Sequence, residues 1–170
     1  MASILMVAGE GLPFIKTGGL ADVIGSLPQA LTERGHEVKV VMPLYKKISD
    51  KYYNELHFDC EYSVSINYHE VPVRVFSKVV DNVCFFFIQH QGYFERDSLY
   101  GYQDDGERFG YFQKAVIEML NQLNYWPNII HCHDWHTGMI PCMVKETHDA
   151  DPRYRAIRFV YTIHNMAYQG

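Results

Sequence analysis

The sequence predicts an α/β fold, in which a mostly parallel, Rossmann-like sheet is flanked by helices and carries an inserted β-hairpin. Short apolar runs alternate along the chain with longer segments that repeat apolar residues at the helical period of 3.6. A loop that contains two adjacent glycines joins the first apolar run to the first of these segments. Two segments in the middle of the chain instead alternate apolar and polar residues, as the strands of a half-exposed hairpin do.

The first unit of this fold lies at the N-terminus. Ser3 to Gly9 is expected to form a buried strand, and about Leu20 to Arg34 a helix that ends at Gly35, because glycine favours the position after a helix. Pro28 lies inside that segment, so either the helix bends there or its first turns form a separate piece. His36 to Pro43 is then a second buried strand. This order forms a right-handed βαβ unit, which implies a parallel sheet covered on both faces.

The middle of the chain predicts antiparallel pairing. Phe58 to Ile66 and Val71 to Val79 are expected to form a hairpin with one face toward solvent, joined by Asn67 to Glu70. Val83 to Gln89 is a further, strongly apolar strand. The segment from Gln91 to Asp105 is rich in aromatic and polar residues and is expected to be a loop. A loop of this length in a compact domain is usually functional or mobile.

The last part of the chain returns to alternating helices and strands. Glu107 to Asn124 is the clearest helix, because its apolar residues recur at the 3.6 period. Asn128 to His133 is expected to be a strand, Trp135 to Thr147 a helix, and Ile157 to Ile163 another strand. The sequence shows no internal repeat or linker, so residues 1–170 are expected to form one domain.

Composition disfavours several classes of protein. Twenty acidic residues against fifteen basic ones give a net charge of −5, which disfavours nucleic acid as a partner. The apolar runs are too short to span a membrane or to form the core of a signal peptide. The four cysteines show no CxxC spacing, which favours reduced thiols in a cytoplasmic protein. An aromatic content of 15% suits either a sugar-binding cleft or a thick core.

The loop before the first helix is a candidate anion site. Its sequence from Lys16 to Val23 puts Gly18 and Gly19 where backbone N–H groups and the positive end of a helix would face a ligand. Lys16 adds a mobile cation, and Asp22 lies in the first turn of the helix. The same residues also fit a plain turn with a surface lysine. The loop matches neither the dinucleotide-binding glycine pattern nor a Walker loop.

Three stretches lie where strands of the predicted parallel sheet end, which is where ligands bind in such sheets. They are the Lys16 loop, the segment from His131 to His136, and His164 with Asn165. Four of the nine histidines lie in these stretches, and this clustering predicts a polar binding surface at one edge of the sheet.

The segment from His131 to His136 permits two interpretations. His131 and His133 point to the same face of a strand, and His136 could join them in a zinc ligand set. No glutamate base with metalloprotease spacing lies nearby, which disfavours a metal. In the other interpretation, Asp134 and a histidine form a hydrogen-bonding floor for a ligand, and no metal is bound.

Four motifs together resemble the bacterial glycogen synthases and the plant starch synthases. They occur in the order of that family along the whole chain. The motifs are Lys16-Thr17-Gly18-Gly19-Leu20-Ala21-Asp22-Val23, Leu31-Thr32-Glu33-Arg34-Gly35-His36-Glu37-Val38, His133-Asp134-Trp135-His136 and Thr162-Ile163-His164-Asn165-Met166-Ala167-Tyr168-Gln169-Gly170. Four co-linear motifs are far more specific than the glycine loop alone.

The resemblance implies a retaining glucosyltransferase. The family transfers glucose from a nucleotide sugar, usually ADP-glucose in bacteria, to the non-reducing end of an α-1,4-glucan such as glycogen or a maltooligosaccharide. Its GT-B fold has two Rossmann-like domains that face each other across a cleft. Residues 1–170 are accordingly expected to be the N-terminal domain, incomplete and without the C-terminal nucleotide-binding domain. Alone, this piece is expected to be inactive, and its uncovered cleft face is expected to favour self-association.

The resemblance also implies roles on the phosphate side of the cleft. Lys16 would contact the phosphates of the donor, Gly18 and Gly19 would form the loop below the diphosphate, and Asp22 would position that loop. A cation, glycine amides and helix ends can stabilise the charge of the departing diphosphate, so neither a metal nor a cofactor is implied.

On the sugar side, the resemblance implies that His164 and Asp134 are the catalytic residues. His164 would hold the transferred glucose near its 6-hydroxyl, and Asp134 would lie beside the sugar and the acceptor. Tyr93 matches a position on the same side, and Asn165 is expected to bind substrate. No nucleophile is assigned, because the family is described as attacking on the face of the leaving group.

Two other functions remain open at the level of the sequence. A non-catalytic α-glucan-binding module would use Tyr93, Tyr100 and Tyr102 as a platform for sugar rings. Such a module would bind maltooligosaccharides whether or not Lys16 is present. A metal-dependent hydrolase would instead be built on the three histidines of the segment from His131 to His136, and would contain stoichiometric zinc.

Overall fold

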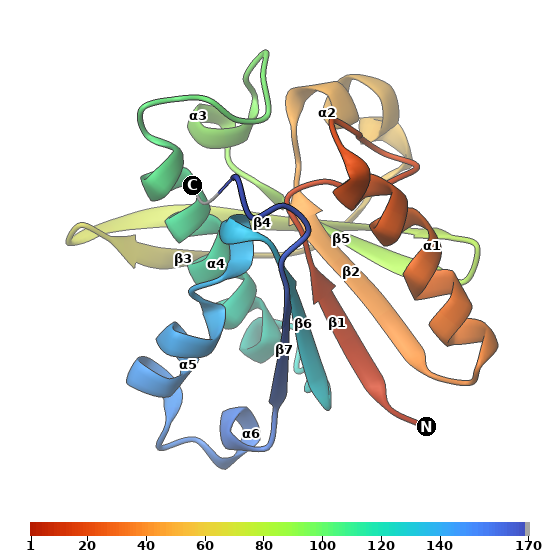
Figure 1. The fold of residues 1–170 in the computed structure, drawn as a ribbon. Helices are drawn as coiled ribbons and strands as arrows, with labels where there is room; N and C mark the ends of the chain where they lie inside the picture. Colours follow the sequence, from red (N-terminus) through yellow and green to blue (C-terminus); the bar gives the residue numbers. More distant parts are fainter. Residues whose placement is uncertain (169–170) are drawn as a thin grey trace.

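The protein is a sheet flanked by helices on both faces (Figure 1). The structure is a computed structural model, and it describes residues 1–168. Its seven strands lie side by side in the order β3-β4-β5-β2-β1-β6-β7. They are β1 (Ser3–Val7), β2 (Glu37–Pro43), β3 (His57–Ile66), β4 (His69–Val80), β5 (Val83–Gln89), β6 (Ile129–His133) and β7 (Arg158–Thr162).

The helices lie between these strands in the sequence. They are α1 (Gly19–Glu33), α2 (Lys46–Tyr52), α3 (Gln91–Phe94), α4 (Asp105–Gln122), α5 (Ile140–His148) and α6 (Pro152–Arg155), with 3-10 turns η1 (Tyr53–Glu55) and η2 (Trp135–Thr137). Among the described residues, no helix has both the length and the apolar character that crossing a membrane requires. Gln169 and Gly170, the last two residues of the fourth motif, lie outside the described residues.

The pairing of the strands confirms the predicted mixed sheet. Strands β5, β2, β1, β6 and β7 run parallel to their neighbours in that series, whereas β3 and β4 are antiparallel to each other and β4 is antiparallel to β5. Strands β1, β2 and β5 inside the sheet are mostly buried, since helices cover both of their faces, whereas the edge strand β7 is mostly exposed. The β3–β4 hairpin is the inserted antiparallel element.

The two faces of the sheet pack against different helices. Phe85 and Phe87 point to the side where Phe14 precedes α1, with ring centroids 5.0 and 4.8 Å from the Phe14 ring. Phe86 points to the opposite face of the sheet. Lys39 lies over the rings of both Phe86 and Tyr125, so Phe86 faces the side on which Tyr125 follows the end of α4. The core therefore has two layers of side chains, one on each face of the sheet.

The hairpin differs from the prediction at its turn. The connection is shorter than expected, because β4 begins at His69 and only Asn67 and Tyr68 lie between the strands, with φ angles of 49° and 65°. A turn with two positive φ angles matches the right-handed twist of the flanking strands. The predicted exposed face is confirmed, since Glu61 pairs with Arg74 on it, whereas Tyr62 on the other face donates to a carbonyl of α4.

The structure confirms one predicted helix, for which two alternatives were open, and corrects another. Helix α1 runs from Gly19 to Glu33 through Pro28, so the alternative in which its first turns form a separate piece is wrong. The predicted helix from Trp135 to Thr147 is divided into the short turn η2 and helix α5. Pro141 at the start of α5 explains the division, because its ring suits the first turn of a helix and not its interior.

The long segment from Gln91 to Asp105 is more ordered than a plain loop. It begins with the short helix α3 and continues to α4 through turns. The prediction also missed helices α2 and α6, which contain seven and four residues and are too short to show a clear helical period.

Candidate functional site at the strand ends

The predicted site residues follow three strands that are neighbours in the sheet. Val7 of β1 pairs with Cys132 of β6, and His133 of β6 pairs with Thr162 of β7, all in parallel. Because parallel strands end at the same edge, the segments that follow β1, β6 and β7 leave the sheet side by side. The glycine loop, Asp134 and His164 belong to these three segments, as the sequence predicts.

The glycine loop is organised around Glu10, which the sequence analysis missed. Glu10 is only 3% exposed, and its carboxylate accepts hydrogen bonds from the Thr17 N–H at 2.5 Å, the Thr17 hydroxyl at 2.6 Å and the Gly18 N–H at 3.1 Å. A carboxylate is stabilised there by the positive end of α1 as well as by these donors. The Gly18 N–H, predicted to lie below a diphosphate, is therefore engaged by a side chain of the same chain.

Gly19 differs from Gly18 in its surroundings. A Cβ atom at Gly19 would meet no atom within 4 Å, whereas one at Gly18 would lie 3.5 Å from a Glu10 carboxylate oxygen. The space over the first residue of α1 is thus open. The only sequence signal for Glu10 is an acidic residue between a buried strand and a glycine loop, and that signal is weak by itself.

Two of the predicted site residues, Lys16 and Asp22, form an ion pair with each other. The Lys16 ammonium group lies 2.6 and 2.7 Å from the two Asp22 carboxylate oxygens, and about half of each side chain is exposed. Asp22 lies in the first turn of α1, so this pair holds the lysine at the N-terminal end of the helix. An exposed pair of this kind contributes little to stability, and its cation can be shared with a ligand.

Asp134 ties the end of β6 to the segment after β7. Its N–H donates to the Thr162 carbonyl at 3.0 Å, and its Oδ1 accepts from the His164 N–H at 2.7 Å. Its backbone has φ 58° and ψ −177°, a conformation that residues other than glycine rarely adopt. Such a conformation costs roughly 1–3 kcal/mol and is found most often at functional sites.

The histidines of β6 form a pair, of which His133 is buried and reaches His164. The Nδ1 atom of His133 lies 2.9 Å from Nε2 of His164, and the rings of His131 and His133 have centroids 4.0 Å apart. His131 also bonds the Thr162 hydroxyl at 2.7 Å. Burial, followed by the neighbouring His131 and His164, lowers the pKa of His133 to about 3. His133 is therefore neutral at physiological pH.

His136 does not join the other two histidines. Its ring lies among those of Trp135, Tyr100 and Phe109, with centroids 4.0, 4.7 and 4.7 Å away. Burial lowers the pKa of His136 to about 3. Across residues 1–168, no three or more His, Cys, Asp or Glu side chains gather so as to hold a metal ion. The zinc ligand set considered from the sequence is therefore not formed in this part of the chain.

Asn165 lies at the rim of a small cavity beside Asp134. The cavity has a volume of about 170 Å³, and its lining comprises Asp134, Trp135, Tyr161, Ile163, Asn165, Met166 and Tyr168. The Asn165 side-chain oxygen accepts from the Ala167 N–H at 2.9 Å, so the amide stabilises the turn after β7. Asn165 therefore lies at the same edge of the sheet as His164.

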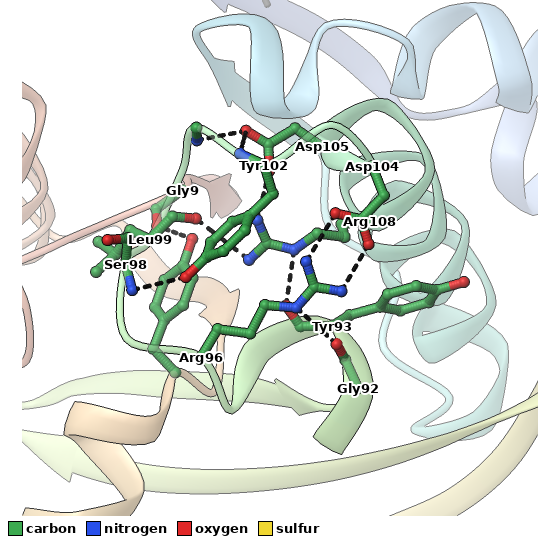
Figure 2. A network of polar contacts seen from close by, with 12 residues as sticks. Gly9, Gly92, Tyr93, Arg96, Ser98, Leu99, Tyr102, Asp104, Asp105 and Arg108 are labelled. Atoms are coloured by element: carbon green, nitrogen blue, oxygen red, sulfur yellow. Dashed lines mark hydrogen bonds and ion pairs between the residues drawn. The ribbon is translucent and has the colours of Figure 1, made fainter.

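The segment between α3 and α4 is held by Arg108, which is fully buried (Figure 2). Its guanidinium group donates to the carbonyl of Tyr93 at 2.7 Å, to the Asp105 carboxylate at 2.5 Å and to the carbonyl of Leu99 at 3.2 Å. A buried arginine needs such a full set of acceptors. These hydrogen bonds hold the segment in one ordered conformation.

A second arginine holds the outer part of the same segment (Figure 2). Arg96 forms a two-pronged ion pair with Asp104 at 2.7 and 2.6 Å and donates to the carbonyl of Gly92 at 2.7 Å. The ring of Tyr102 lies 4.8 Å from the Arg96 guanidinium carbon and 4.9 Å from that of Arg108. Tyr102 therefore takes part in two cation–π contacts inside the network.

Tyr93 lies apart from the strand-end residues. Its ring stacks on His90 and contacts Tyr111, with centroids 4.3 and 5.1 Å away, and its hydroxyl donates to Glu107 of α4. Figure 2 shows its ring extending to the side opposite Gly9 and Leu99. Burial, with the hydrogen bond to Glu107, raises the pKa of Tyr93 to about 12.

Tyr100, and not Tyr93, connects the long segment to the strand ends. Its ring contacts His136 and Trp135, with centroids 4.7 and 6.3 Å away. Burial raises the pKa of Tyr100, and the nearby charge of Glu10 raises it further. Sequence spacing could not distinguish the two tyrosines, because both lie in a segment without a regular period.

Comparison with known proteins shows one family over almost the whole chain. The family described as the starch synthase catalytic domain matches residues 3–170. Glycogen synthases from Desulforamulus reducens and Clostridium kluyveri are 44% and 46% identical over 167 residues, which is 98% of this chain. The chain spans 35% of the length of these relatives.

Solved structures support the fold. The catalytic domain of starch synthase IV from Arabidopsis thaliana, bound to ADP and acarbose, is 32% identical with a TM-score of 0.86 over 98% of this chain and 34% of its own. Sucrose-phosphate synthase from Thermosynechococcus elongatus is 12% identical with a TM-score of 0.58 and shares the fold alone. The expected GT-B glycosyltransferase fold is thereby confirmed. By its motifs, its fold and these matches, the chain belongs to the starch synthase catalytic domain family, together with the glycogen synthases.

Proposed function

We propose that this chain forms one side of the active site of a retaining glycogen synthase, which transfers glucose from ADP-glucose to the non-reducing end of an α-1,4-glucan. The observation that carries the proposal is that Lys16, Asp134 and His164 lie in the segments that follow three neighbouring parallel strands. Identities of 44% and 46% to glycogen synthases over 98% of the chain support the same assignment. The ADP and acarbose bound to starch synthase IV support a nucleotide and a glucan as the classes of ligand.

The charges at the loop suggest how it would act on the donor. The ammonium group of Lys16 is exposed beside the N-terminal end of α1, where it can turn from Asp22 to a diphosphate. A lysine and the helix end would together stabilise the negative charge that develops as the anomeric bond breaks. No metal is needed for this role.

The sugar would lie on the side of β6 and β7. In this proposal His164 holds the transferred glucose, and Asp134, which binds the His164 N–H, keeps that histidine in position. Asn165 borders the adjoining cavity and would contact the substrate there. Tyr93, whose ring packs against His90 and α4, is not part of this arrangement in the present structure.

The site is proposed to be completed by a second domain. The chain spans about a third of the length of its relatives. The described loop also contains two carboxylates, Glu10 and Asp22, against one lysine, so its own charge does not favour a diphosphate. Further cations from a second domain would supply the missing positive charge.

The proposal is tested by titration of ADP-glucose, ADP and maltoheptaose into this chain and into a polypeptide extended through the proposed second domain. Donor binding and glucosyl transfer are expected only in the extended protein. Tight binding of maltoheptaose by the short chain, with no donor effect in either protein, would favour a glucan-binding module instead.

Lys16→Ala in the extended protein gives a sharper test. The loss of a charged contact to phosphate is expected to weaken ADP binding by about tenfold to a hundredfold. The matched control is Lys47→Ala, which changes another exposed lysine. Isothermal titration with ADP measures both variants. Equal affinities for ADP would remove the phosphate role from Lys16.

The contacts of the tyrosines do not favour the glucan-binding alternative. The ring of Tyr102 already contacts the guanidinium groups of two arginines, and the ring of Tyr100 packs against His136 and Trp135. A sugar platform needs an aromatic face that is free for the ligand. The Lys16 loop and the strand-end residues remain the better basis for a function.

A further inference from the structure

Glu10 is a buried carboxylate in the middle of the candidate phosphate loop. Its side chain accepts three hydrogen bonds from two consecutive residues, Thr17 and Gly18, at 2.5 to 3.1 Å. Charge-assisted bonds of this kind are about twice as strong as bonds between neutral groups. The carboxylate therefore determines the path of the chain between the end of β1 and the start of α1.

The backbone around Glu10 is fixed from two sides. The Gly9 carbonyl accepts a hydrogen bond from the Tyr45 hydroxyl at 2.8 Å, and a Cβ atom at Gly9 would lie 2.8 Å from the His136 ring. Gly11 donates to the Ile15 carbonyl at 3.1 Å and fits against Ile24. Glu10 thus cannot leave its place without disturbing packed neighbours on both sides.

The hydrogen bonds of Glu10 have a direct consequence for ligand binding. An N–H group that donates to a buried carboxylate is not available to a phosphate oxygen, and a phosphate would be repelled from that carboxylate. The Thr17 and Gly18 amides are both engaged in this way. Lys16, which is exposed, and the open space above Gly19 lie outside the part of the loop that Glu10 occupies.

We propose that Glu10 is a positioning residue of the donor site. It engages the Thr17 and Gly18 amides so that Lys16 and the Gly19 end of α1 face the diphosphate. The role rests on the proposed function, whereas the contact between Glu10 and the loop does not. The ligand class is a nucleoside diphosphate or its sugar ester, recognised at its phosphates by a lysine and a helix end.

The contact is tested first, in this chain and without ligand. In the Glu10→Gln variant, the amide proton resonances of Thr17 and Gly18 are expected to move upfield, because a neutral acceptor replaces the carboxylate. Glu33→Gln, an exposed site at the end of α1, is the matched control and leaves both resonances in place. Unchanged Thr17 and Gly18 resonances in Glu10→Gln would overturn the contact and the proposal with it.

The positioning role is tested in the polypeptide extended through the proposed second domain. Glu10→Gln is expected to raise KM for ADP-glucose by about tenfold while KM for maltoheptaose stays the same. Thr17→Val, which removes one of the three hydrogen bonds, is expected to raise KM for ADP-glucose by a smaller factor. A lower KM for ADP-glucose in Glu10→Gln would mean that the carboxylate competes with the phosphates, and would overturn the proposal.

A third measurement, the titration of ADP, does not depend on glucosyl transfer. When ADP is titrated into the extended protein, the Gly19 amide resonance is expected to shift strongly and those of Thr17 and Gly18 only weakly. Larger shifts at Thr17 and Gly18 than at Gly19 would contradict the assigned arrangement. If the extended protein transfers no glucose at all, the proposed function fails, while the ligand-free resonances still decide whether Glu10 holds the loop.

Discussion

At the scale of single residues, buried polar groups determine how the candidate site is held together. Glu10 holds the glycine loop, His133 meets His164, and the strained backbone of Asp134 ties β6 to the segment after β7. Glu10, His133 and Asp134 are buried, so each depends on a specific partner. Loss of the partner leaves a buried polar group unsatisfied, which costs about 1–3 kcal/mol.

The two most deeply buried histidines predict a dependence of stability on pH. The pKa values of His133 and His136 are lowered to about 3 by burial, against 6.5 for an exposed histidine. Below pH 6.5 the unfolded chain therefore binds protons that the folded chain does not, and stability falls as the pH falls. Near pH 5, two such groups together lower the free energy of unfolding by roughly 3 kcal/mol for each unit by which the pH falls.

Urea unfolding at pH 7, 6 and 5 measures this slope. His136→Phe keeps an aromatic ring among the surrounding rings and removes one titrating group, so it is expected to remove about half of the contribution of the two histidines. The same slope in His136→Phe and in the unmodified chain would show that His136 does not remain neutral in the folded state.

At the scale of elements, the segment between α3 and α4 shows how a long connection without sequence periodicity becomes ordered. Its order comes from Arg96 and Arg108, which bind carbonyls and carboxylates of the segment itself. The order places Tyr100 against the strand ends and turns Tyr93 toward α4. The shape of this part of the chain thus depends on two arginines, of which Arg108 is fully buried.

Arg108→Leu is expected to destabilise the protein by about 3–5 kcal/mol, because it leaves the largely buried Asp105 carboxylate without its partner. Arg153→Leu, which removes an exposed pair with Asp151, is the matched control and is expected to destabilise the protein much less. Urea unfolding of both variants makes the comparison. Similar losses in the two would show that burial adds nothing to the Arg108 pair.

At the scale of the whole molecule, the sheet has two different ends. The β3 end carries the charged pair of Glu61 and Arg74, whereas the β7 end exposes apolar side chains. These side chains form the β7 edge patch, which comprises Val160, Tyr161, Ile163 and Tyr168, each between 44% and 72% exposed. An exposed apolar edge strand is a ready surface for pairing with another chain.

The chain by itself is therefore expected to self-associate through the β7 edge patch. Light scattering over a concentration series should show the mean mass rising with concentration. Val160→Lys is expected to reduce this rise, whereas Val79→Lys, an exposed valine on β4, should leave it unchanged. A monomer at every concentration would contradict the prediction.

Local sequence patterns were sufficient for most of the elements. The buried strands, the hairpin and helices α1 and α4 follow from periodicity, and the end of α1 follows from Gly35, whose φ is 85°. Helices α2 and α6 were missed because they are short. The boundary between η2 and α5 was missed because the signal of Pro141 competed with a continuous helical pattern.

The sequence by itself determined the class of fold, the family and the three segments that meet at the strand ends. Apolar periodicity and co-linear motifs are properties of neighbouring residues and can be read along the chain. Only the tertiary structure decided that Glu10 accepts hydrogen bonds from the Thr17 and Gly18 amides, that His133 contacts His164, and that Tyr100 packs against His136. The reason is geometric, since a periodic pattern assigns a side chain to a face, whereas a hydrogen bond requires two atoms within about 3 Å. That distance depends on the register of the strands and the path of the loops, which the packing of the whole chain sets.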